Sequence, residues 1–377
     1  MKIGIVTEYY YPLLGGIAEN VHHTAARVRR MGHDVKIITS NGGHRRYATG
    51  EPGLWDESDI IRLGRTTRLY SNGSFAHVTI GLGLRGQMKK ILKAERFDLL
   101  HIHSPIVPTL PMIAVAEATC PRVGTFHTFF DRSVLYTAMN GTFQRWLDAL
   151  DGQIAVSKTC IDALGQHFRM NARVIPNGVD TDEFSPTVRP LDAFHDGRRN
   201  ILFLSRFDPR NGLRFMIRAF ELVKRSFPDV RLIVVGDGPL KPYYKVFIPR
   251  RIAGDVYFAG HVREERARYY ASCDVFCSPV MKASFGITLL EAMASGKPIV
   301  ATENQGYREL LGPSEGFLLP QNDPAAFADA ICRLLEDEDL AASMGAAGRT
   351  KALAYSWDGI ARDIACFYDE ILTRRCD

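Results

Sequence analysis

One stretch of the chain, KASFGITLLEAMASG at residues 282–296, combines a glycine turn, a helix start and a single acidic residue, Glu291. The predicted turn ends at Gly286, and the backbone amides from there to Thr288 would point outward at the helix start. Such amides form a site for phosphate oxygens. A carboxylate about one turn further along could accept two hydrogen bonds from vicinal hydroxyls, as on a ribose. The alternative is a first-turn carboxylate that only offsets the helix dipole.

Arginine follows another apolar run, in LSRFDPRNG, where Arg206 ends a predicted strand and Arg210 precedes Asn211 and Gly212. The planar guanidinium suits a diphosphate because it donates two parallel charge-assisted hydrogen bonds. A solvated charge at a helix start is the alternative. The nearby VVGDGP turn, residues 234–239, is a weak signal because glycine and proline often do no more than turn the chain.

The first half of the chain has two similar positions. Gly15 and Gly16 follow the first predicted strand, and they can let backbone amides approach a phosphate or a sugar. The G-x-G-x-x-G fingerprint is absent there, which argues against a nicotinamide-dependent oxidoreductase. His127, in GTFHTFF, lies just past another predicted strand, as a ligand contact or as a structural histidine.

Metal ligands are poorly represented. Asp180 and Asp182 have the D-x-D spacing of some metal-binding sugar transferases, but they lie in a proline-flanked loop. Cys273 and Cys277 have no second pair of Cys or His nearby, so the spacing does not indicate zinc. We therefore expect no metal and no other cofactor.

The glycine, arginine and histidine positions described above follow short β-rich runs that alternate with amphipathic segments. The runs are 2–7, 34–39, 98–103, 121–127, 152–157 and 172–177, then 200–205, 230–236, 255–260, 274–279 and 297–302. The alternation predicts an α/β protein with two doubly wound, Rossmann-like domains. In such sheets ligands bind beyond the carboxyl ends of the strands, where the glycines, arginines and histidine above are expected.

The domain boundary is predicted near residue 185. A chain of 377 residues is too long for one ordinary core, and the segment 181–200 is polar, holds two prolines and lacks periodicity. We expect domains at 1–185 and 186–357. Residues 356–372 space apolar side chains at helical intervals, so one face must be buried, although spacing does not say against which domain.

Composition indicates a soluble protein of the cytoplasm. The chain is 46% hydrophobic and 24% charged, no apolar run approaches the roughly 20 residues that span a bilayer, and the start lacks a secretory signal. Seven scattered cysteines suit reduced thiols, and a net charge of +5 is too mild to indicate nucleic acid. Three basic clusters would suit an anionic membrane surface, here the inner face of the plasma membrane, or are solvated helix faces. They are Arg27, Arg29 and Arg30; Arg62, Arg65 and Arg68; and Lys89, Lys90 and Lys93.

Together the motifs resemble the retaining glycosyltransferases of family 4, and most of all the bacterial phosphatidylinositol mannosyltransferases. The matching pieces are the GGI turn, HIHSP, GTFHT, IAVSKTC, IPNGVDTDEF, SRFDPRNG, VVGDGP and SFGITLLEAMASGKPIVAT. They cover both halves almost end to end. The resemblance implies the glycosyltransferase B fold, with two Rossmann-like domains facing across a cleft. It also implies an acceptor-binding first domain, a nucleotide-sugar-binding second domain and a last helix, 358–377, that packs back on the first.

Residue roles follow from the resemblance. It implies that Glu291 holds the donor ribose, Arg206 the diphosphate, and Gly16 the diphosphate and sugar, with His127 near the transferred sugar and Val262 near the base. His127, Arg206 and Glu291 are the implied catalytic residues. The implied donor-binding residues are Gly15, Gly16, Arg206, Arg210, Asn211, Gly236, Val262, Ala283, Ser284, Phe285, Gly286, Ile287, Thr288 and Glu291. The implied acceptor-binding residues are Tyr9, His127 and Thr128.

The implied reaction moves a hexose from a nucleoside diphosphate to a hydroxyl, forming an α-linkage with retention. GDP-mannose is favoured slightly over UDP-glucose, and the acceptor is a phosphoinositide-like lipid or another glycolipid or glycan precursor. Preorganised cations and amide dipoles would stabilise the leaving diphosphate in place of a metal. With the leaving phosphate assisting the incoming hydroxyl, the reaction needs positioning more than a protein base.

Two positions depart from the family pattern. Asn211 stands where the family has a phosphate-binding lysine, and Ala283 stands where the E-x7-E motif has its first glutamate. That glutamate normally touches sugar hydroxyls, and Lys282 is a neighbour that could help in its place. The departures raise an alternative, a catalytically weak sugar-nucleotide-binding protein, which turnover would distinguish from an enzyme.

Overall fold

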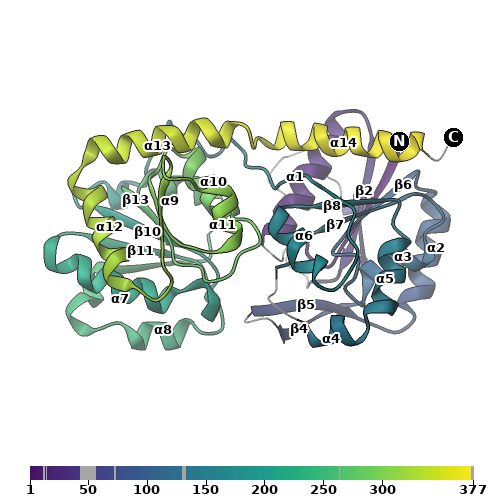
Figure 1. The fold of residues 1–377 in the computed structure, drawn as a ribbon, viewed down its shortest axis with the longest axis horizontal. Coiled ribbons are helices and arrows are strands. Elements are labelled where there is room, and N and C mark those ends of the chain that lie inside the picture. The colour runs from purple at the N-terminus through teal and green to yellow at the C-terminus, as the bar shows by residue number, and fades with distance from the viewer. Residues whose placement is uncertain are drawn as a thin grey trace. The chain divides into compact units, whose positions relative to one another are not determined.

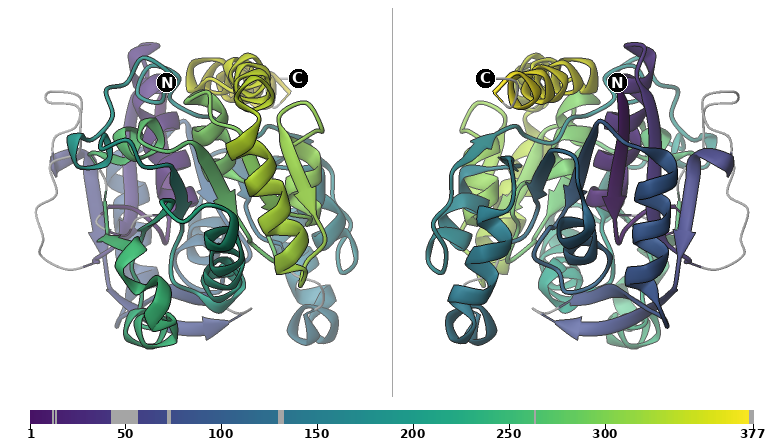
Figure 2. Two further views of the ribbon diagram at one scale, coloured as in Figure 1. Left: turned by 90° about the vertical axis from the view of Figure 1, so that its left-hand side faces the viewer. Right: turned by 90° about the vertical axis from the view of Figure 1, so that its right-hand side faces the viewer.

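The structure is a computed structural model that describes residues 1–11, 13, 15–42, 57–71, 74–129, 133–262 and 264–374. The chain divides into two compact units (Figure 1). Unit 1 comprises Met1–Asn177 and Trp357–Asp377, and unit 2 comprises Gly178–Ser356. Each unit is a parallel sheet with helices on both faces (Figures 1 and 2). The predicted α/β class with two Rossmann-like domains is confirmed.

The sheet of unit 1 contains seven strands, and its neighbouring strands pair in parallel. Their order is β3 (Ile60–Leu63), β2 (Asp34–Ser40), β1 (Lys2–Thr7), β6 (Leu99–His103), β7 (Arg122–Phe126), β8 (Gly152–Ala155) and β9 (Ala172–Val174). Six of these were predicted. The sequence reading missed β3 and the antiparallel hairpin of β4 (Arg65–Ser71) and β5 (Ser74–Ile80) that follows it.

Helices α1 (Gly16–Arg30) and α14 (Trp357–Thr373) cover one face of this sheet, and α2 (Leu84–Glu95) and α3 (Leu110–Glu117) cover the other. Alternate residues of a strand belong to the hydrophobic cores on the two faces of the sheet, because successive side chains of a strand point to opposite faces. Ile3 and Leu99 pack with α1 and α14, whereas Val6 and Leu100 pack with α2 and α3. Helices α4 (Val134–Ala138), α5 (Asn140–Asp148) and α6 (Lys158–Gly165) complete the unit.

The C-terminal helix α14 buries its apolar face in unit 1. Its buried residues are Trp357, Ile360, Ala361, Ile364, Phe367, Tyr368 and Ile371. Polar contacts fix it as well: Arg27 Nε of α1 donates to Asp358 Oδ1 at 2.9 Å, and the Arg173 guanidinium donates twice to the Glu370 carboxylate, both at 2.7 Å. These long-range contacts determine that unit 1 covers the helix, which could not be predicted from helical spacing.

The sheet of unit 2 has the order β12 (Val256–Gly260), β11 (Arg231–Val235), β10 (Asn200–Leu204), β13 (Val275–Ser278), β14 (Ile299–Thr302) and β15 (Gly316–Leu319), all parallel. All but β15 were predicted. Its helices are α7 (Leu213–Ser226), α8 (Lys241–Phe247), α9 (Arg266–Ala271), α10 (Ile287–Ala294), α11 (Gln305–Leu310), α12 (Pro324–Glu336) and α13 (Glu338–Leu353). The core of the unit is built on aromatic residues such as Phe203, Phe220 and Phe327, each at most 1% exposed.

Candidate functional site

Unit 2 has its topological switch point between β10 and β13. The chain runs from β10 outward to β11 and β12, and then returns to the other side of β10 with β13. Open α/β sheets bind ligands at the carboxyl end of such a switch. Arg206 follows β10, and the segment 279–286 follows β13. Of the sequence-predicted donor residues, Arg206 and those from Ala283 to Gly286 therefore lie at this edge.

Backbone hydrogen bonds join the turns at this edge. The Met281 amide donates to the Arg210 carbonyl at 2.9 Å, which links the turns after β10 and β13. The Phe207 amide donates to the Asp237 carbonyl at 3.1 Å, which links the turns after β10 and β11, and the Gly236 amide donates to the carbonyl of Gly260, the last residue of β12, at 2.8 Å. The turns that the sequence showed as separate motifs thus form one connected rim.

Two glycines of the rim are required by close backbone approach. Gly212 has φ of 77°, and a Cβ there would lie 2.1 Å from the Pro279 carbonyl oxygen. Gly236 has φ of 141°, and a Cβ there would lie 1.9 Å from the Ser205 carbonyl oxygen. No L side chain fits at such distances. The glycine of VVGDGP therefore brings β10 and β11 together at the site, which is more than a simple change of chain direction.

Arg206 is held at the end of β10 by an acidic neighbour. Its guanidinium lies 3.1 Å from the Asp208 carboxylate, and its side chain remains 45% exposed whereas that of Asp208 is 5% exposed. Asn211 is buried, and its Nδ2 donates to the Arg206 carbonyl oxygen at 2.8 Å. The Asn211 amide thus stabilises the turn that presents Arg206.

The segment after β13 is supported from β14 and beyond. The Val280 carbonyl accepts hydrogen bonds from Thr302 Oγ1 at 2.7 Å and from Asn304 Nδ2 at 2.9 Å. Gln321 Nε2 donates to the Met281 carbonyl at 2.9 Å. These supporting residues carried no signal in the sequence, because they follow other strands and only tertiary structure brings them here.

The helix predicted after this segment begins at Ile287, with Gly286 as its N-cap residue. A Cβ at Gly286 would lie 3.0 Å from the Tyr307 ring. The first amides of a helix have no intrahelical acceptor, so Gly286 and Ile287 offer donors at this edge. Ala283, Ser284, Ile287 and Thr288 are half-buried, whereas Phe285 is buried.

Glu291 lies further along α10 and is 2% exposed. Its Oε1 lies 3.2 Å from the Arg266 guanidinium, and its Oε2 accepts a hydrogen bond from Tyr270 Oη at 2.8 Å. It is the fifth residue of α10, and the first turn of that helix has no acidic residue, so the helix-dipole explanation of Glu291 is wrong. Burial, and then the Glu291 charge, raise the pKa of Tyr270 well above its usual range, so the phenol stays a donor.

The sequence reading missed Arg266 and Tyr270, although a signal existed. The two residues are four apart on the helix predicted at 263–271, so they share one face. That face meets Glu291, and its two contacts hold the carboxylate in one orientation. Val262, which was expected near the base, lies half-buried between β12 and α9.

The switch point of unit 1 lies between β1 and β6. Gly15 and Gly16 are exposed at the start of α1, and a Cβ at Gly15 would meet no atom within 4 Å. Tyr9 is half-buried, and its hydroxyl accepts a hydrogen bond from the His77 amide at 3.0 Å. Thr128 is exposed just beyond β7.

Glu8 is a buried carboxylate that the sequence reading passed over. Its Oε1 accepts from the Leu110 amide at 3.0 Å and from Thr109 Oγ1, and its Oε2 accepts from Thr79 Oγ1. These bonds join the end of β1 to β5 and to the start of α3. Desolvation raises the pKa of Glu8, and the hydrogen bonds partly offset that effect.

Three histidines form a buried group at the ends of β6 and β7. His127 Nε2 lies 2.8 Å from His103 Nδ1. His101 Nδ1 lies 2.6 Å from the Tyr368 hydroxyl, and His101 Nε2 lies 2.6 Å from Thr125 Oγ1. Burial lowers the pKa of His101 and His127 to about 3 and that of His103 well below its usual value. All three rings are therefore neutral at neutral pH.

Other sequence candidates have structural roles. Asp180 Oδ1 accepts from the Asp182 amide at 3.1 Å and from the Glu183 amide at 3.0 Å, so it caps its own turn. Within the described ranges, no group of three or more His, Cys, Asp or Glu side chains is placed to hold a metal ion. Nor does any helix there have the length and apolar character needed to cross a bilayer.

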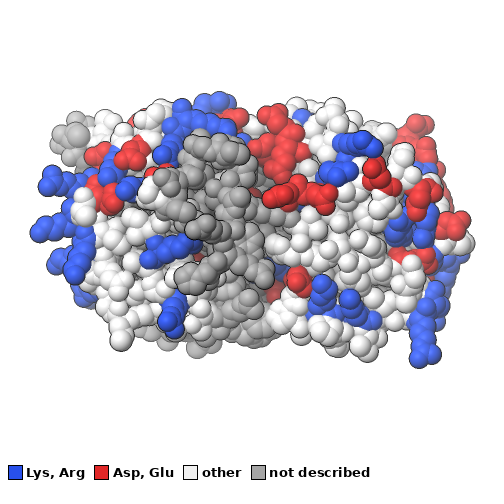
Figure 3. All heavy atoms as spheres, turned by 180° about the vertical axis from the view of Figure 1, so that it is seen from behind, with Lys and Arg blue, Asp and Glu red and all other residues white. Residues whose placement is uncertain are grey.

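The basic clusters differ in how far they face solvent. Arg27 is buried and paired with Asp358, and Arg29 lies 2.5 Å from Asp59. Arg62 and Arg65 lie on β3 and β4, so they do not belong to a helix face, and the side chain of Arg68 lies outside the described residues. Lys89, Lys90 and Lys93 are exposed on α2. Figure 3 shows Lys and Arg side chains gathered at the left edge, where unit 1 carries α2.

Comparison with known proteins identifies the family of this chain. Residues 14–183 match the sequence model described as Glycosyltransferase Family 4, and residues 198–337 match the one described as Glycosyl transferases group 1. The chain is 33% identical over 383 residues to the phosphatidyl-myo-inositol mannosyltransferase of Mycobacterium tuberculosis, covering 98% of this chain and 97% of that protein. It is 27% identical to a GDP-mannose-dependent alpha-mannosyltransferase of Mycolicibacterium smegmatis, covering 100% of this chain and 99% of that protein.

Solved structures share the fold. Sucrose-phosphate synthase from Thermosynechococcus elongatus superposes with a TM-score of 0.77 at 20% identity, covering 99% of both chains. Anabaena HepE in complex with UDP-glucose superposes with a TM-score of 0.74 at 20% identity, covering 98% of this chain and 100% of that chain. The chain therefore has the glycosyltransferase B fold, belongs to glycosyltransferase family 4 and is a glycosyltransferase.

Proposed function

We propose that this enzyme transfers mannose from GDP-mannose to a hydroxyl of a phosphatidylinositol-like lipid, with retention and an α-linkage. The observation that carries the proposal is the 33% identity, over nearly the full length, to a phosphatidyl-myo-inositol mannosyltransferase. The name of the Mycolicibacterium smegmatis relative includes GDP-mannose, which supports GDP-mannose as the donor here. UDP-glucose is the competing donor, and another glycolipid or glycan precursor is the competing acceptor.

In this proposal the rim of unit 2 binds the donor. Arg206 binds the diphosphate, and its pairing with Asp208 supports the role because it holds the guanidinium in place before the ligand arrives. Amides at the start of α10, whose N-cap residue is Gly286, bind phosphate oxygens. These groups would stabilise the charge that develops on the leaving diphosphate.

Glu291 holds the ribose in this proposal. Two vicinal hydroxyls need an oriented acceptor, and the contacts from Arg266 and Tyr270 support the role because they fix the direction of the carboxylate. Val262 would lie near the base. Arg210, Gly236 and the half-buried residues around Ala283 would complete the donor site.

Unit 1 supplies the acceptor side in this proposal. His127 would contact the transferred sugar, Gly15 and Gly16 the diphosphate and sugar, and Tyr9 and Thr128 the acceptor. The position of these residues just beyond β1 and β7, at the carboxyl edge of the sheet, supports these assignments. A neutral His127 suits a hydrogen-bonding role, since retention requires no strong protein base.

We also propose that α2 binds anionic lipid at the inner face of the plasma membrane. Lys89, Lys90 and Lys93 are exposed on it, and Leu82, just before it, is 96% exposed. Each basic residue near an anionic surface contributes about 1 kcal/mol. Changing the three lysines to glutamine should weaken sedimentation with phosphatidylglycerol vesicles. Arg214, Arg218 and Arg225 of α7 are a matched control, since they are three exposed bases on another helix.

The direct test has two stages. A melting-temperature screen with GDP-mannose, UDP-glucose, GDP and UDP should show stabilisation by the guanine compounds, because a ligand that binds only the folded state raises stability by mass action. Labelled GDP-mannose with phosphatidylinositol vesicles should then give a labelled lipid. Stabilisation by the uridine compounds alone would contradict the assignment of GDP-mannose as the donor. Donor binding without transfer to any acceptor and without hydrolysis would favour the catalytically weak binding protein.

A further inference from the structure

The His103–His127 contact has only two possible arrangements of protons. Both rings are neutral, so one hydrogen lies between His103 Nδ1 and His127 Nε2. Either His103 donates it from Nδ1, or His127 donates it from Nε2. The choice fixes the tautomers of both rings, because a neutral imidazole carries a single N–H.

The other nitrogen of His103 favours the first arrangement. His103 is 1% exposed, and its Nε2 is buried with no hydrogen-bond partner among the residues that the structure describes. The neighbouring His101 ring, 4.4 Å away between centroids, has its two nitrogens engaged with Tyr368 and Thr125. If His103 accepted at Nδ1, its N–H would be at Nε2, as a buried donor without an acceptor. Orphaned buried N–H groups are rarer in proteins than under-satisfied acceptors.

We propose that His103 is a positioning residue that donates its Nδ1–H to His127 Nε2 and so holds His127 as the Nδ1–H tautomer. His127 then presents a hydrogen-bond donor, and not a base, to its ligand. The inference about catalysis rests on the proposed function, in which that ligand is the transferred sugar. A ring N–H would bind a sugar oxygen and would orient the hexose without removing a proton.

The strands explain why this pair forms. His101 and His103 share one face of β6 because they are two residues apart, and His127, the first residue after β7, lies two residues beyond Thr125. His103 pairs in register with Thr125, so His127 extends just past the end of β7 beside it. The H-x-H spacing in LHIHSP thus places one histidine against α14 and the next against His127.

The tautomer can be read directly by 15N NMR of the imidazoles in the whole enzyme, with His127→Gln to assign the signals. We expect a protonated Nδ1 and an unprotonated Nε2 on His127. Protonation at Nε2 would overturn the proposal. This measurement needs no substrate, so it stands or fails separately from the assigned reaction.

Variants test the consequence for transfer. His103→Phe removes the donor, whereas His103→Asn keeps an N–H near the position of Nδ1. We expect kcat to fall about tenfold or more in the Phe variant, the effect of a lost hydrogen bond of 1–2 kcal/mol, and to recover largely in the Asn variant. Tyr368→Phe removes a buried hydrogen bond to His101 and should leave kcat unchanged. Equal kcat in the Phe and Asn variants, with both folded by thermal melting, would contradict the role. Absent transfer by the wild-type enzyme would instead refute the proposed function.

Discussion

Glu291 of α10 and Arg266 of α9 form a buried ion pair, with 3.2 Å between the carboxylate and the guanidinium and with side chains that are 3% and 16% exposed. A carboxylate that looked isolated in the sequence is therefore part of a packed group with Tyr270. Its substitution must affect stability as well as ligand binding. The two effects have to be separated before Glu291 is assigned to the ribose.

Glu291→Ala should lower the free energy of unfolding by about 3 kcal/mol or more, because it leaves the Arg266 charge buried without its partner. Arg266→Met combined with Glu291→Leu should recover most of that loss but should not recover donor affinity. Denaturant unfolding and calorimetry with GDP-mannose measure the two quantities. If the double variant bound donor normally, Glu291 would not belong to the ribose site.

Asn211→Lys should have opposite effects on stability and donor affinity. Asn211 Nδ2 donates to the Arg206 carbonyl from a buried position, so its loss should cost about 1 kcal/mol of unfolding free energy. The added ammonium should strengthen binding of the diphosphate by Coulomb attraction. Asn211→Ala is the matched control, since it loses the hydrogen bond and adds no charge. Unchanged donor affinity in the Lys variant would show that this position does not face the diphosphate.

Ala283→Glu should change turnover or sugar preference. Ala283 is half-buried in the segment after β13, where a carboxylate could reach sugar hydroxyls. A hydrogen bond to a charged group contributes about 1.5–3 kcal/mol, so kcat/KM should change roughly tenfold or more. Ala283→Gln tests whether the charge is needed. Identical kinetics for all three proteins, with GDP-mannose and with UDP-glucose, would place the sugar elsewhere.

Acid should destabilise unit 1. His101 and His127 have folded pKa values of about 3, and that of His103 is also lowered, whereas an unfolded histidine titrates near 6.5. Below pH 6.5 the unfolded chain binds more protons than the folded one, so stability falls as the pH falls. The three groups together should cost roughly 4 kcal/mol between pH 7.5 and 5.5.

Denaturant unfolding at several pH values checks this prediction, with the range above pH 7.5 as the reference in which these rings are neutral in both states. The raised pKa of Glu8 acts in the opposite direction, since its folded carboxyl binds a proton more readily than the unfolded one. If the free energy of unfolding stayed constant from pH 7.5 to 5.5, both in the wild type and in His103→Phe, the histidine prediction would be wrong.

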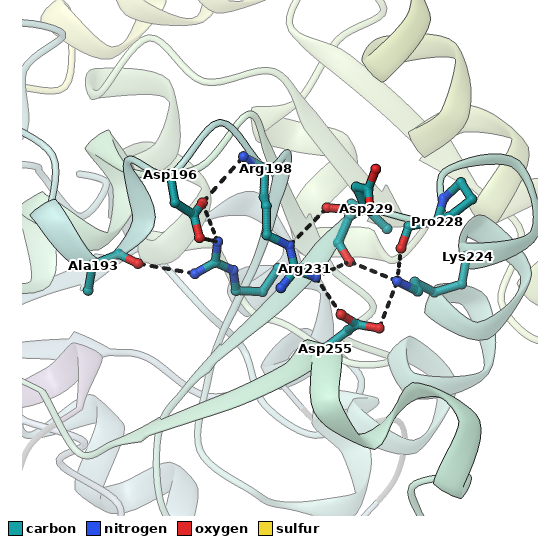
Figure 4. A network of polar contacts seen from close by, with 9 residues as sticks. Ala193, Asp196, Arg198, Lys224, Pro228, Asp229, Arg231 and Asp255 are labelled. Carbon is teal, nitrogen blue, oxygen red and sulfur yellow. Dashed lines mark hydrogen bonds and ion pairs between the residues drawn. The ribbon is translucent and has the colours of Figure 1, made fainter.

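A polar network at the opposite edge of the unit 2 sheet should affect stability alone (Figure 4). Arg231, at the start of β11, donates twice to the Asp196 carboxylate at 2.6 Å and once to the Ala193 carbonyl at 3.1 Å. Lys224 lies 2.7 Å from Asp255 in the same network. Arg231→Met should lower Tm while donor affinity stays unchanged, because ligands of such sheets bind at the carboxyl edge. A loss of donor affinity in the folded variant would contradict that placement.

The sequence contained most of the local information. Short apolar runs separated by amphipathic segments were enough to predict most strands of both sheets, because parallel strands are buried on both faces and their sequences are nearly continuously apolar. β15 and the β4–β5 hairpin were missed, and the hairpin belongs to neither parallel sheet. At the site, turn chemistry alone located Arg206 and Gly236 just after their strands.

The partners of those residues were not predictable in the same way. Glu291 was visible as a lone carboxylate, but its pairing with Arg266 and Tyr270 depends on how α9 packs against α10. His127 was visible beyond a strand, but its contact with His103 depends on the parallel register of β6 and β7.

The sequence by itself therefore determined the fold class and the residues that follow the strands, because apolar runs and turn residues are local properties. The glycosyltransferase family came from the resemblance of its motifs. Tertiary structure alone decided which residues of unit 1 hold α14, that Asn211 supports the Arg206 turn, and that Glu291 and His127 are held by buried partners. Those outcomes depend on contacts between residues far apart in the chain. Burial then keeps His101, His103 and His127 neutral, which no spacing of residues can specify.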